Sequence, residues 1–173
     1  MDQLYIPPER AKALRKSRDL LKIERASSCS IKPDDGLVTI DGDPYEQLLL
    51  KNVIAAYGNG FDADSALLLM NDDYYMSVID ITLYAKNDSR AQQLKARIIG
   101  ENGKTKRYIE SVSSAKISVY GEHVCLIGES EPIDEAEAAI YSLLKGEKHK
   151  TAYSKMEAAH RKNKASRKRN LMV

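Results

Sequence analysis

The sequence predicts an α+β protein built from two similar units, each with a three-stranded sheet and three helices. Helical and strand-like apolar patterns both occur, and both halves repeat one order: strand, helix, break, helix, strand, turn, strand and a proline-led helix. The register of the two halves is close, because Ile40 and Ile127 end the third strands while Pro44 and Pro132 begin the last helices. Such a repeat, about 70 residues long, predicts two separate domains whose helices cover one face of a sheet.

The first half begins with a short apolar strand, after which two prolines stand where a helix can start. The expected elements are a strand at 2–6, helices at 8–14 and 19–26, strands at 28–31 and 37–40, and a helix at 45–57. Pro33-Asp34-Asp35-Gly36 predicts the turn between the strands, because proline fixes one dihedral and glycine accepts positive φ. Leu48, Leu49, Val53 and Ala56 are expected on the buried side of the last helix.

The second half begins with a run in which Val78, Ile79, Ile81 and Leu83 suit a buried strand. The expected elements are that strand at 76–84, helices at 89–99 and 104–112, a hairpin at 115–120 and 123–127, and a long helix from Pro132. Ser89 is the expected cap of the first of these helices. The spacing of its apolar residues predicts one buried face.

Four segments follow from this repeat. We expect a first domain at 1–60, a connector at 61–76 with a short helix at 64–70, a second domain at 77–146 and a basic helical tail at 147–173. The tail continues the last helix and ends in the cations of 167–169.

Charges are segregated along the chain, although the net charge is only +2. Residues 90–116 contain 7 basic and 2 acidic side chains, and residues 145–173 contain 10 basic and 2 acidic ones. The intervening residues 117–144 contain 6 acidic side chains and neither lysine nor arginine. This alternation indicates a local site for a polyanion, whereas the simpler interpretation is a series of solvated faces.

Other classes of protein fit the sequence less well. The two cysteines, Cys29 and Cys125, lie far apart in strand-like runs, so we expect buried thiols and a reducing, cytoplasmic location. The chain lacks both a signal-peptide pattern and the roughly 20-residue apolar run of a membrane helix. Three scattered histidines, without a nucleophile–base pair or a metal-ligand spacing, argue against an enzyme or a cofactor.

The loop Gly100-Glu101-Asn102-Gly103 joins two predicted helices and is the main functional candidate. Glycines let a phosphate backbone approach closely, and the start of the second helix offers free N–H groups to an anion. Helix, G-x-x-G and helix form the nucleic-acid site of KH domains, in which the loop clamps the RNA backbone. The alternative interpretation is a glycine-rich turn between two packed helices.

Residues around this loop complete the predicted RNA site, with bases lying over an apolar groove lined by Ile98, Ile99, Ile109 and Ile117 and edged by Lys116. The candidate RNA-binding residues are Arg97, Ile98, Ile99, Gly100, Glu101, Asn102, Gly103, Lys104, Thr105, Lys106, Arg107, Lys116 and Ile117. The candidate auxiliary contacts are Arg15, Lys16, Arg18, Arg161, Lys162, Arg167, Lys168 and Arg169.

The segment 97–110, RIIGENGKTKRYIE, together with ISVYG at 117–121, resembles the second KH domain of a family of small-subunit ribosomal RNA assembly proteins. This family is called partner of the Nob endonuclease in eukaryotes and has a compact archaeal homologue. IPPER at 6–10 and NDDYY at 71–75 resemble its first domain and its connector. The similarity spans roughly residues 3–160, and the short N-terminus resembles the archaeal form.

The resemblance implies two tandem type I KH domains and binding near the 3′ end of small-subunit ribosomal RNA during subunit maturation. It also implies two protein partners, the Nob endonuclease and the alpha subunit of translation initiation factor two. The chain departs from the family's archaeal pattern in the first domain, where Leu14-Arg15-Lys16-Ser17-Arg18 replaces a G-x-x-G loop. We therefore expect that domain to be a scaffold or a protein interface, with at most long-range phosphate contacts.

Three alternatives remain at this stage: a KH accessory subunit of an RNA-degrading complex, a KH regulator of messenger RNA, and a protein-interaction adaptor. The first two usually carry another RNA-binding fold, and no run of short strands remains here to build one. The adaptor predicts that the Gly100 loop could be lost without effect.

Overall fold

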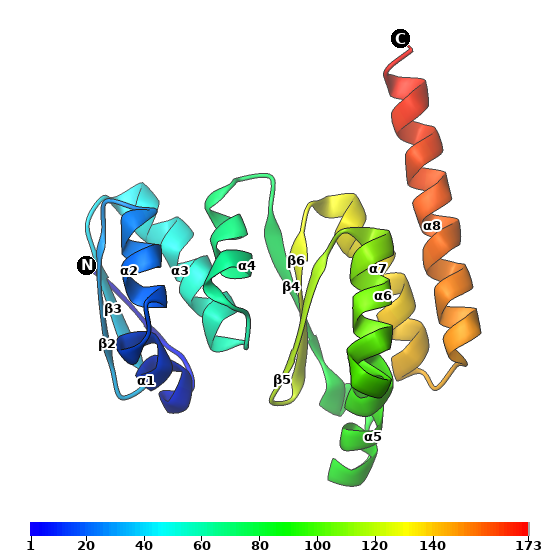
Figure 1. Cartoon of the computed structure of the whole chain (residues 1–173), viewed down its shortest axis with the longest axis horizontal. Coiled ribbons are helices and arrows are strands. Elements are labelled where there is room, and N and C mark those ends of the chain that lie inside the picture. Colours follow the sequence, from blue (N-terminus) through cyan, green and yellow to red (C-terminus); the bar gives the residue numbers. More distant parts are fainter. Residues whose placement is uncertain (173) are drawn as a thin grey trace. The chain divides into compact units, whose positions relative to one another are not determined.

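The computed structural model describes residues 1–172 as two compact units, Met1–Met76 and a second unit from Ser77 onward. Each unit contains its own three-stranded sheet, in the orders β1-β3-β2 and β4-β6-β5 (Figure 1). The third strand of each unit lies in the centre of its sheet, so the second strand is always an edge strand. The predicted mixed α and β class, with two three-stranded sheets, is confirmed.

The first unit follows the predicted order of elements. It comprises β1 (Asp2–Tyr5), α1 (Pro8–Lys16), α2 (Asp19–Arg25), β2 (Ser30–Asp34), β3 (Leu37–Asp41), α3 (Pro44–Gly58), α4 (Ala63–Leu67) and a 3-10 turn, η1 (Leu68–Met70). The β2–β3 turn is tighter than predicted, because Asp34 pairs with Leu37 and only two residues remain between the strands. Asp35 and Gly36 both have positive φ, as two-residue hairpin turns require, and Pro33 lies inside β2.

Helix α3 buries only part of the face that was predicted. Val53 and Ala56 are fully buried as expected, together with Leu50 and Ile54, whereas Leu48 is 58% exposed. A helix rich in apolar residues on several sides gives a weak periodic signal, so the sequence did not distinguish between neighbouring stripes. Asp43 caps the helix by accepting from the N–H groups of Tyr45 and Glu46.

Residues 61–76, expected to be a connector, pack within the first unit. Helix α4 and η1 lie against α3, and Ala66 and Leu69 are buried. Arg10 links α1 to the end of α3, because its guanidinium donates to the carbonyls of Tyr57 and Phe61 at 2.8 and 2.7 Å. The first compact unit therefore extends to Met76.

The second unit begins within β4 (Tyr75–Asp80). It continues with a 3-10 turn η2 (Ile81–Tyr84), α5 (Asp88–Ile99), a 3-10 turn η3 (Glu101–Gly103), α6 (Lys104–Ser113), β5 (Lys116–Tyr120), β6 (His123–Gly128), α7 (Ser130–Leu144) and α8 (His149–Asn170). The predicted strand 76–84 ends early, because the Asp80 carboxylate accepts from the Thr82 N–H at 2.8 Å and starts η2. Val78 and Leu83 are exposed, contrary to the prediction. Asn87 rather than Ser89 caps α5.

Helix α8 packs along α7 and α6 (Figure 1). The sequence predicted a tail that continues the last helix, but α7 ends at Leu144 and α8 begins anew at His149. Ala152 and Met156 are fully buried in the core of the second unit. Farther along, the buried Glu135 carboxylate contacts His160 Nδ1 at 2.8 Å and Asn163 Nδ2 at 2.9 Å. The first four turns of α8 are thus part of the folded unit, and the exposed cations concentrate toward its end.

Both cysteines are free and buried, which confirms the prediction of buried thiols. Burial raises the pKa of Cys125 to about 11, so its thiol stays protonated at neutral pH. Across residues 1–172, we find no helix long and apolar enough to cross a membrane. The same residues contain no cluster of three or more His, Cys, Asp or Glu side chains able to hold a metal ion.

Candidate nucleic-acid interface

The loop Gly100–Gly103 is a sharp corner between α5 and α6. Gly100 has φ 74° and ψ 172°, and Gly103 has φ 74° and ψ 13°. A Cβ on Gly100 would lie 2.7 Å from the Thr105 Cβ, whereas one on Gly103 would meet only the Arg107 guanidinium, at 2.9 Å. Glycine at 100 is therefore required both by its positive φ and by the close contact with Thr105. Glycine at 103 is required mainly by its positive φ.

The outer side of this corner is open to solvent. Glu101, Asn102, Lys104 and Arg107 are exposed, and no side chain among residues 1–172 caps the first turn of α6, which begins after Gly103. The first N–H groups of a helix have no partner inside it and attract anions. In α6 the Lys104 N–H donates back to the Glu101 carbonyl of η3, so the groups that could meet an anion are those that follow it. An accessible, uncapped helix start with two nearby cations can accept a phosphate, and the protein's own side chains do not cover it.

The apolar residues predicted to line a groove are mostly core residues. Ile98 and Ile109 are fully buried and Ile117 is 3% exposed, whereas Ile99 is 37% exposed. Ile98 and Ile117 therefore belong to the core of the second unit and do not offer a surface to a base. The sequence did not distinguish core isoleucines from isoleucines that could contact a base, because both kinds follow the same apolar spacing. Lys116, at the start of β5, is exposed as the site requires.

Three other predicted contact residues are engaged inside the protein. Arg97 donates from Nη1 to the Leu143 carbonyl at 2.9 Å and from Nη2 to the Glu147 carbonyl. Thr105 is buried beneath Gly100, and Lys106 forms an ion pair with Glu110 at 3.6 Å. Thr105 is uncharged, and Arg97 contacts backbone carbonyls. Lys106 instead pairs with the Glu110 carboxylate, which a phosphate could readily replace.

The edge strand β5 carries a feature that sequence reasoning missed. The Ile117 N–H points away from β6 and donates to Glu110 Oε1 at 2.8 Å. Backbone groups alternate in direction along an antiparallel strand, so the N–H and C=O of Val119 also face outward. The first unit repeats the arrangement, since Ile31 N–H donates to Glu24 Oε1 at 2.9 Å across the same seven-residue separation. This shared spacing of Glu and Ile is a signal that could have been found in the sequence.

The corresponding corner in the first unit is closed to a phosphate. Only Ser17 and Arg18 separate α1 from α2, and the Asp19 N–H already donates to Ser17 Oγ at 3.1 Å. The Asp19 carboxylate occupies the first turn of α2 and accepts from the Tyr57 hydroxyl at 3.0 Å. A carboxylate in the first turn takes the place that an anionic ligand would need. Arg15, Lys16 and Arg18 are exposed around this corner.

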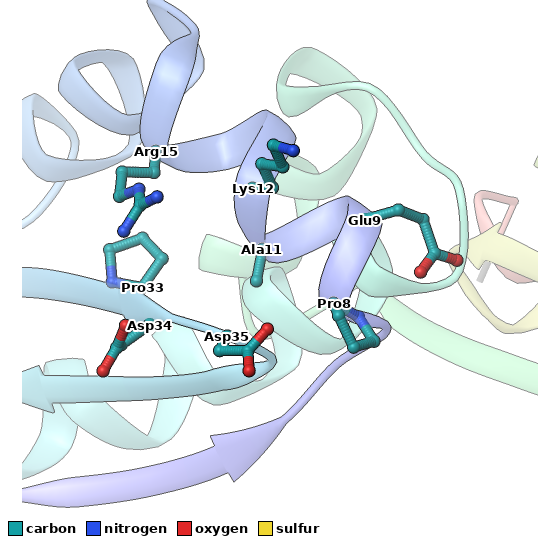
Figure 2. Close-up of a pocket in the computed structure, with 8 residues that line it drawn as sticks. All are labelled: Pro8, Glu9, Ala11, Lys12, Arg15, Pro33, Asp34 and Asp35. Carbon is teal, nitrogen blue, oxygen red and sulfur yellow. The ribbon is translucent and has the colours of Figure 1, made fainter.

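A hollow lies between α1 and the β2–β3 hairpin of the first unit (Figure 2). It is lined by Pro8, Glu9, Ala11, Lys12, Arg15, Pro33, Asp34 and Asp35. The hairpin side presents two carboxylates, while Arg15 lies near Pro33 on the helix side. Pro33 occupies the position that Val119 has in the second unit, two residues after the isoleucine bound by glutamate, and it has no N–H to donate. Charge and edge chemistry therefore both disfavour RNA in this hollow.

The predicted auxiliary cations of α8 differ in their surroundings. Arg161, Lys162, Lys168 and Arg169 are exposed. Arg167, in contrast, forms an ion pair with Glu131. The exposed cations form a second basic region in the same unit as the loop.

Comparison with known families agrees with this description of the second unit. Residues 75–161 match a model described as a eukaryotic type KH domain, KH domain type I, of the Pno1 family. A KH domain-containing protein of Methanocaldococcus jannaschii is 38% identical over 172 residues, which covers 95% of this chain and 76% of that protein.

Eukaryotic relatives match over a shorter region. The pre-rRNA-processing protein pno1 of Aspergillus fumigatus is 31% identical over 99 residues, or 56% of this chain. The match covers 39% of that protein, so the similarity spans about two fifths of the eukaryotic relative.

Solved structures share the fold over most of the chain. The crystal structure of a complex of a/eIF2alpha, aDim2p and rRNA from Pyrococcus horikoshii OT3 contains a chain that this protein resembles with a TM-score of 0.83. The identity is 28%, and the match covers 93% of this chain and 94% of the other. These similarities show that the chain belongs to the Pno1/Dim2-like family of KH-domain proteins, as an archaeal-type member.

Proposed function

We propose that this protein binds single-stranded ribosomal RNA near the 3′ end of the small-subunit rRNA and supports maturation of the small ribosomal subunit. The binding site is the Gly100–Gly103 loop with the start of α6, and the protein acts by binding, not by catalysis. The observation that carries the proposal is the open, uncapped corner at Gly103, flanked by Lys104 and Arg107.

Three findings support this function. The loop lies within the region matched by the KH model, and KH loops clamp the backbone of single-stranded RNA. Relatives carry the name pre-rRNA-processing protein, and one similar solved structure contains rRNA. The closed corner of the first unit leaves it the role of a scaffold or protein interface. Initiation factor two alpha is the protein partner supported by the similar complex, and the Nob endonuclease is a further proposed partner; both would be met in the cytoplasm.

Direct binding tests the proposal. A fluorescein-labelled RNA of the 3′-terminal small-subunit sequence should bind the full chain more tightly as a single strand than as a duplex, because only splayed bases fit a KH groove. Fluorescence anisotropy at fixed salt measures both affinities, and ultraviolet crosslinking with mass spectrometry locates the contact. Crosslinks at 99–107 are expected. Equal affinity for both forms, or crosslinks confined to the first unit, would contradict the assignment.

The exposed α8 cations should add affinity without sequence preference. Replacing Arg161, Lys162 and Lys168 by Gln should weaken binding and reduce the slope of log K against log salt by about 0.7 for each lost phosphate contact. Anisotropy titrations at several salt concentrations give that slope. Arg167→Gln is a single-site variant for comparison, because the Arg167 charge is already paired with Glu131. An unchanged slope in the triple variant would exclude α8 from the RNA contacts.

A further inference from the structure

Both ends of the Gly100–Gly103 loop are held by the first turns of α8 and the segment that leads into it. On the near side, Arg97 lies in the last turn of α5, and its guanidinium donates to the carbonyls of Leu143 and Glu147. The Arg97 carbonyl in turn accepts from His149 Nε2 at 2.9 Å. The residue three positions before the first glycine is thus bonded through both its side chain and its backbone.

On the far side of the loop, Thr105 connects the start of α6 with α8. The Tyr153 hydroxyl lies 3.3 Å from Thr105 Oγ1, and the Tyr153 ring lies 4.5 Å from that of Tyr108. Tyr108 donates to the Glu157 carboxylate, one turn farther along α8. This hydrogen bond raises the pKa of Tyr108, so the phenol remains a neutral donor.

The contact between Thr105 and Gly100 transmits these restraints to the loop. Thr105 is 5% exposed, and an added Cβ on Gly100 would lie 2.7 Å from both the Thr105 Cβ and its backbone N. The two residues therefore have no free space between them. A shift of Thr105 toward the loop would displace Gly100 directly.

The segment between α7 and α8 is itself fixed in place. The Glu147 carboxylate accepts from Lys155 Nζ at 2.6 Å and also from the Ser142 hydroxyl. The hydrogen bond from Lys155, followed by that from Ser142, lowers the pKa of Glu147, so its carboxylate stays ionised well below neutral pH. The Glu147 carbonyl that Arg97 contacts therefore belongs to an ordered turn.

We propose that Arg97 and Tyr153 are positioning residues that fix the RNA-binding conformation of the Gly100–Gly103 loop against α8. The first turns of α8 then form part of the RNA-binding unit, beyond the usual strand, two helices, two strands and helix. This inference rests on the proposed function of the loop. A loop held in place before RNA arrives loses less conformational entropy on binding, which raises affinity without any new contact to RNA.

Arg97→Lys in the full chain separates positioning from direct contact. Lysine keeps the charge but cannot donate to two carbonyls in the geometry of a guanidinium fork. We expect amide hydrogen exchange at residues 100–106, measured without RNA, to accelerate about tenfold. RNA affinity should fall about threefold or more, with the slope of log K against log salt unchanged. Tyr153→Phe, which keeps the ring packing and removes the hydroxyl, should give a smaller change in the same direction.

Arg25→Lys is the matched control, because Arg25 is exposed in the first unit and is not among the proposed RNA contacts, so it should leave loop exchange and RNA affinity at the wild-type values. Wild-type exchange in Arg97→Lys would overturn the proposal. So would a loss of affinity in Arg97→Gln that Arg97→Lys restores, because that pattern indicates direct contact of Arg97 with phosphate. If wild-type protein bound no RNA, the proposed function would fail, while the exchange rates would still decide whether α8 positions the loop.

Discussion

Asn102→Asp combined with Gly103→Asp is expected to lower the affinity for single-stranded RNA about a hundredfold, because each carboxylate near a phosphate costs on the order of 1–2 kcal/mol at the surface. Both positions have positive φ, 50° and 74°, which aspartate tolerates better than most residues do. Asn102 is exposed, and among residues 1–172 a new Cβ at 103 would meet only the flexible end of Arg107. Anisotropy titration measures the loss, and circular dichroism checks the fold.

Ser114→Asp is the matched control for this loop variant. Ser114 is exposed, has φ 67°, and lies at the other end of the same helix, so it introduces a carboxylate with a similar backbone cost. RNA affinity should fall by no more than about threefold, because the new carboxylate lies near Lys116 at the edge of the proposed site but more than a Debye length from the loop at physiological salt. A double variant that binds as tightly as this control would remove the loop from the RNA site.

Gly100 is left unchanged in this design for a physical reason. Any side chain there would strain a backbone at φ 74° and ψ 172° and would overlap with Thr105. A loss of RNA binding in Gly100→Asp would therefore combine electrostatic repulsion with structural damage. Gly103 separates the two effects, although the sequence presents both glycines as equivalent.

The features that the sequence predicted correctly are those written in local patterns. The order of elements, the Pro44-led helix and the β5–β6 hairpin follow from periodicity and turn chemistry within a few residues of each position. The G-x-x-G corner was predictable for the same reason, because glycine marks positive φ. Its accessibility required the structure, since nothing local states whether a distant helix covers a loop.

The features that sequence reasoning missed depend on contacts between distant segments. Arg97 was assigned to RNA because it precedes the loop and is positive, and that contact stays a prediction. Its guanidinium also donates to carbonyls 46 and 50 residues later in the chain, which no local pattern could reveal. Ile98 and Ile117 were placed in a groove because they are apolar and near the loop, but both are in the core. The many cations of α8 led to the prediction of a basic tail. Ala152 and Met156 nevertheless recur at a helical spacing of four on its buried face.

Met156→Ala is expected to destabilise the second unit by about 2–4 kcal/mol, the usual cost of truncating a fully buried long side chain and leaving a cavity. Met156 is completely buried, and it belongs to the same core cluster as Ile98 and Ile109, which lie on the two helices that flank the Gly100–Gly103 loop. The urea concentration at the midpoint of unfolding, followed by the NMR resonances of residues 77–172, should fall. The unfolding midpoint of the first unit should remain unchanged. Faster amide exchange at the loop should accompany the loss, since α8 supports both features.

Met172→Ala provides the control for this substitution, because Met172 is 88% exposed and its removal should change stability by less than about 0.5 kcal/mol. The comparison holds residue type constant and varies only burial. Equal urea midpoints for the two variants would mean that α8 does not contribute to the core in solution, and residues 147–172 would then be a detachable basic extension. A fall confined to Met156→Ala would instead make α8 an integral part of the second folded unit, and its exposed cations would then be fixed in place relative to the loop.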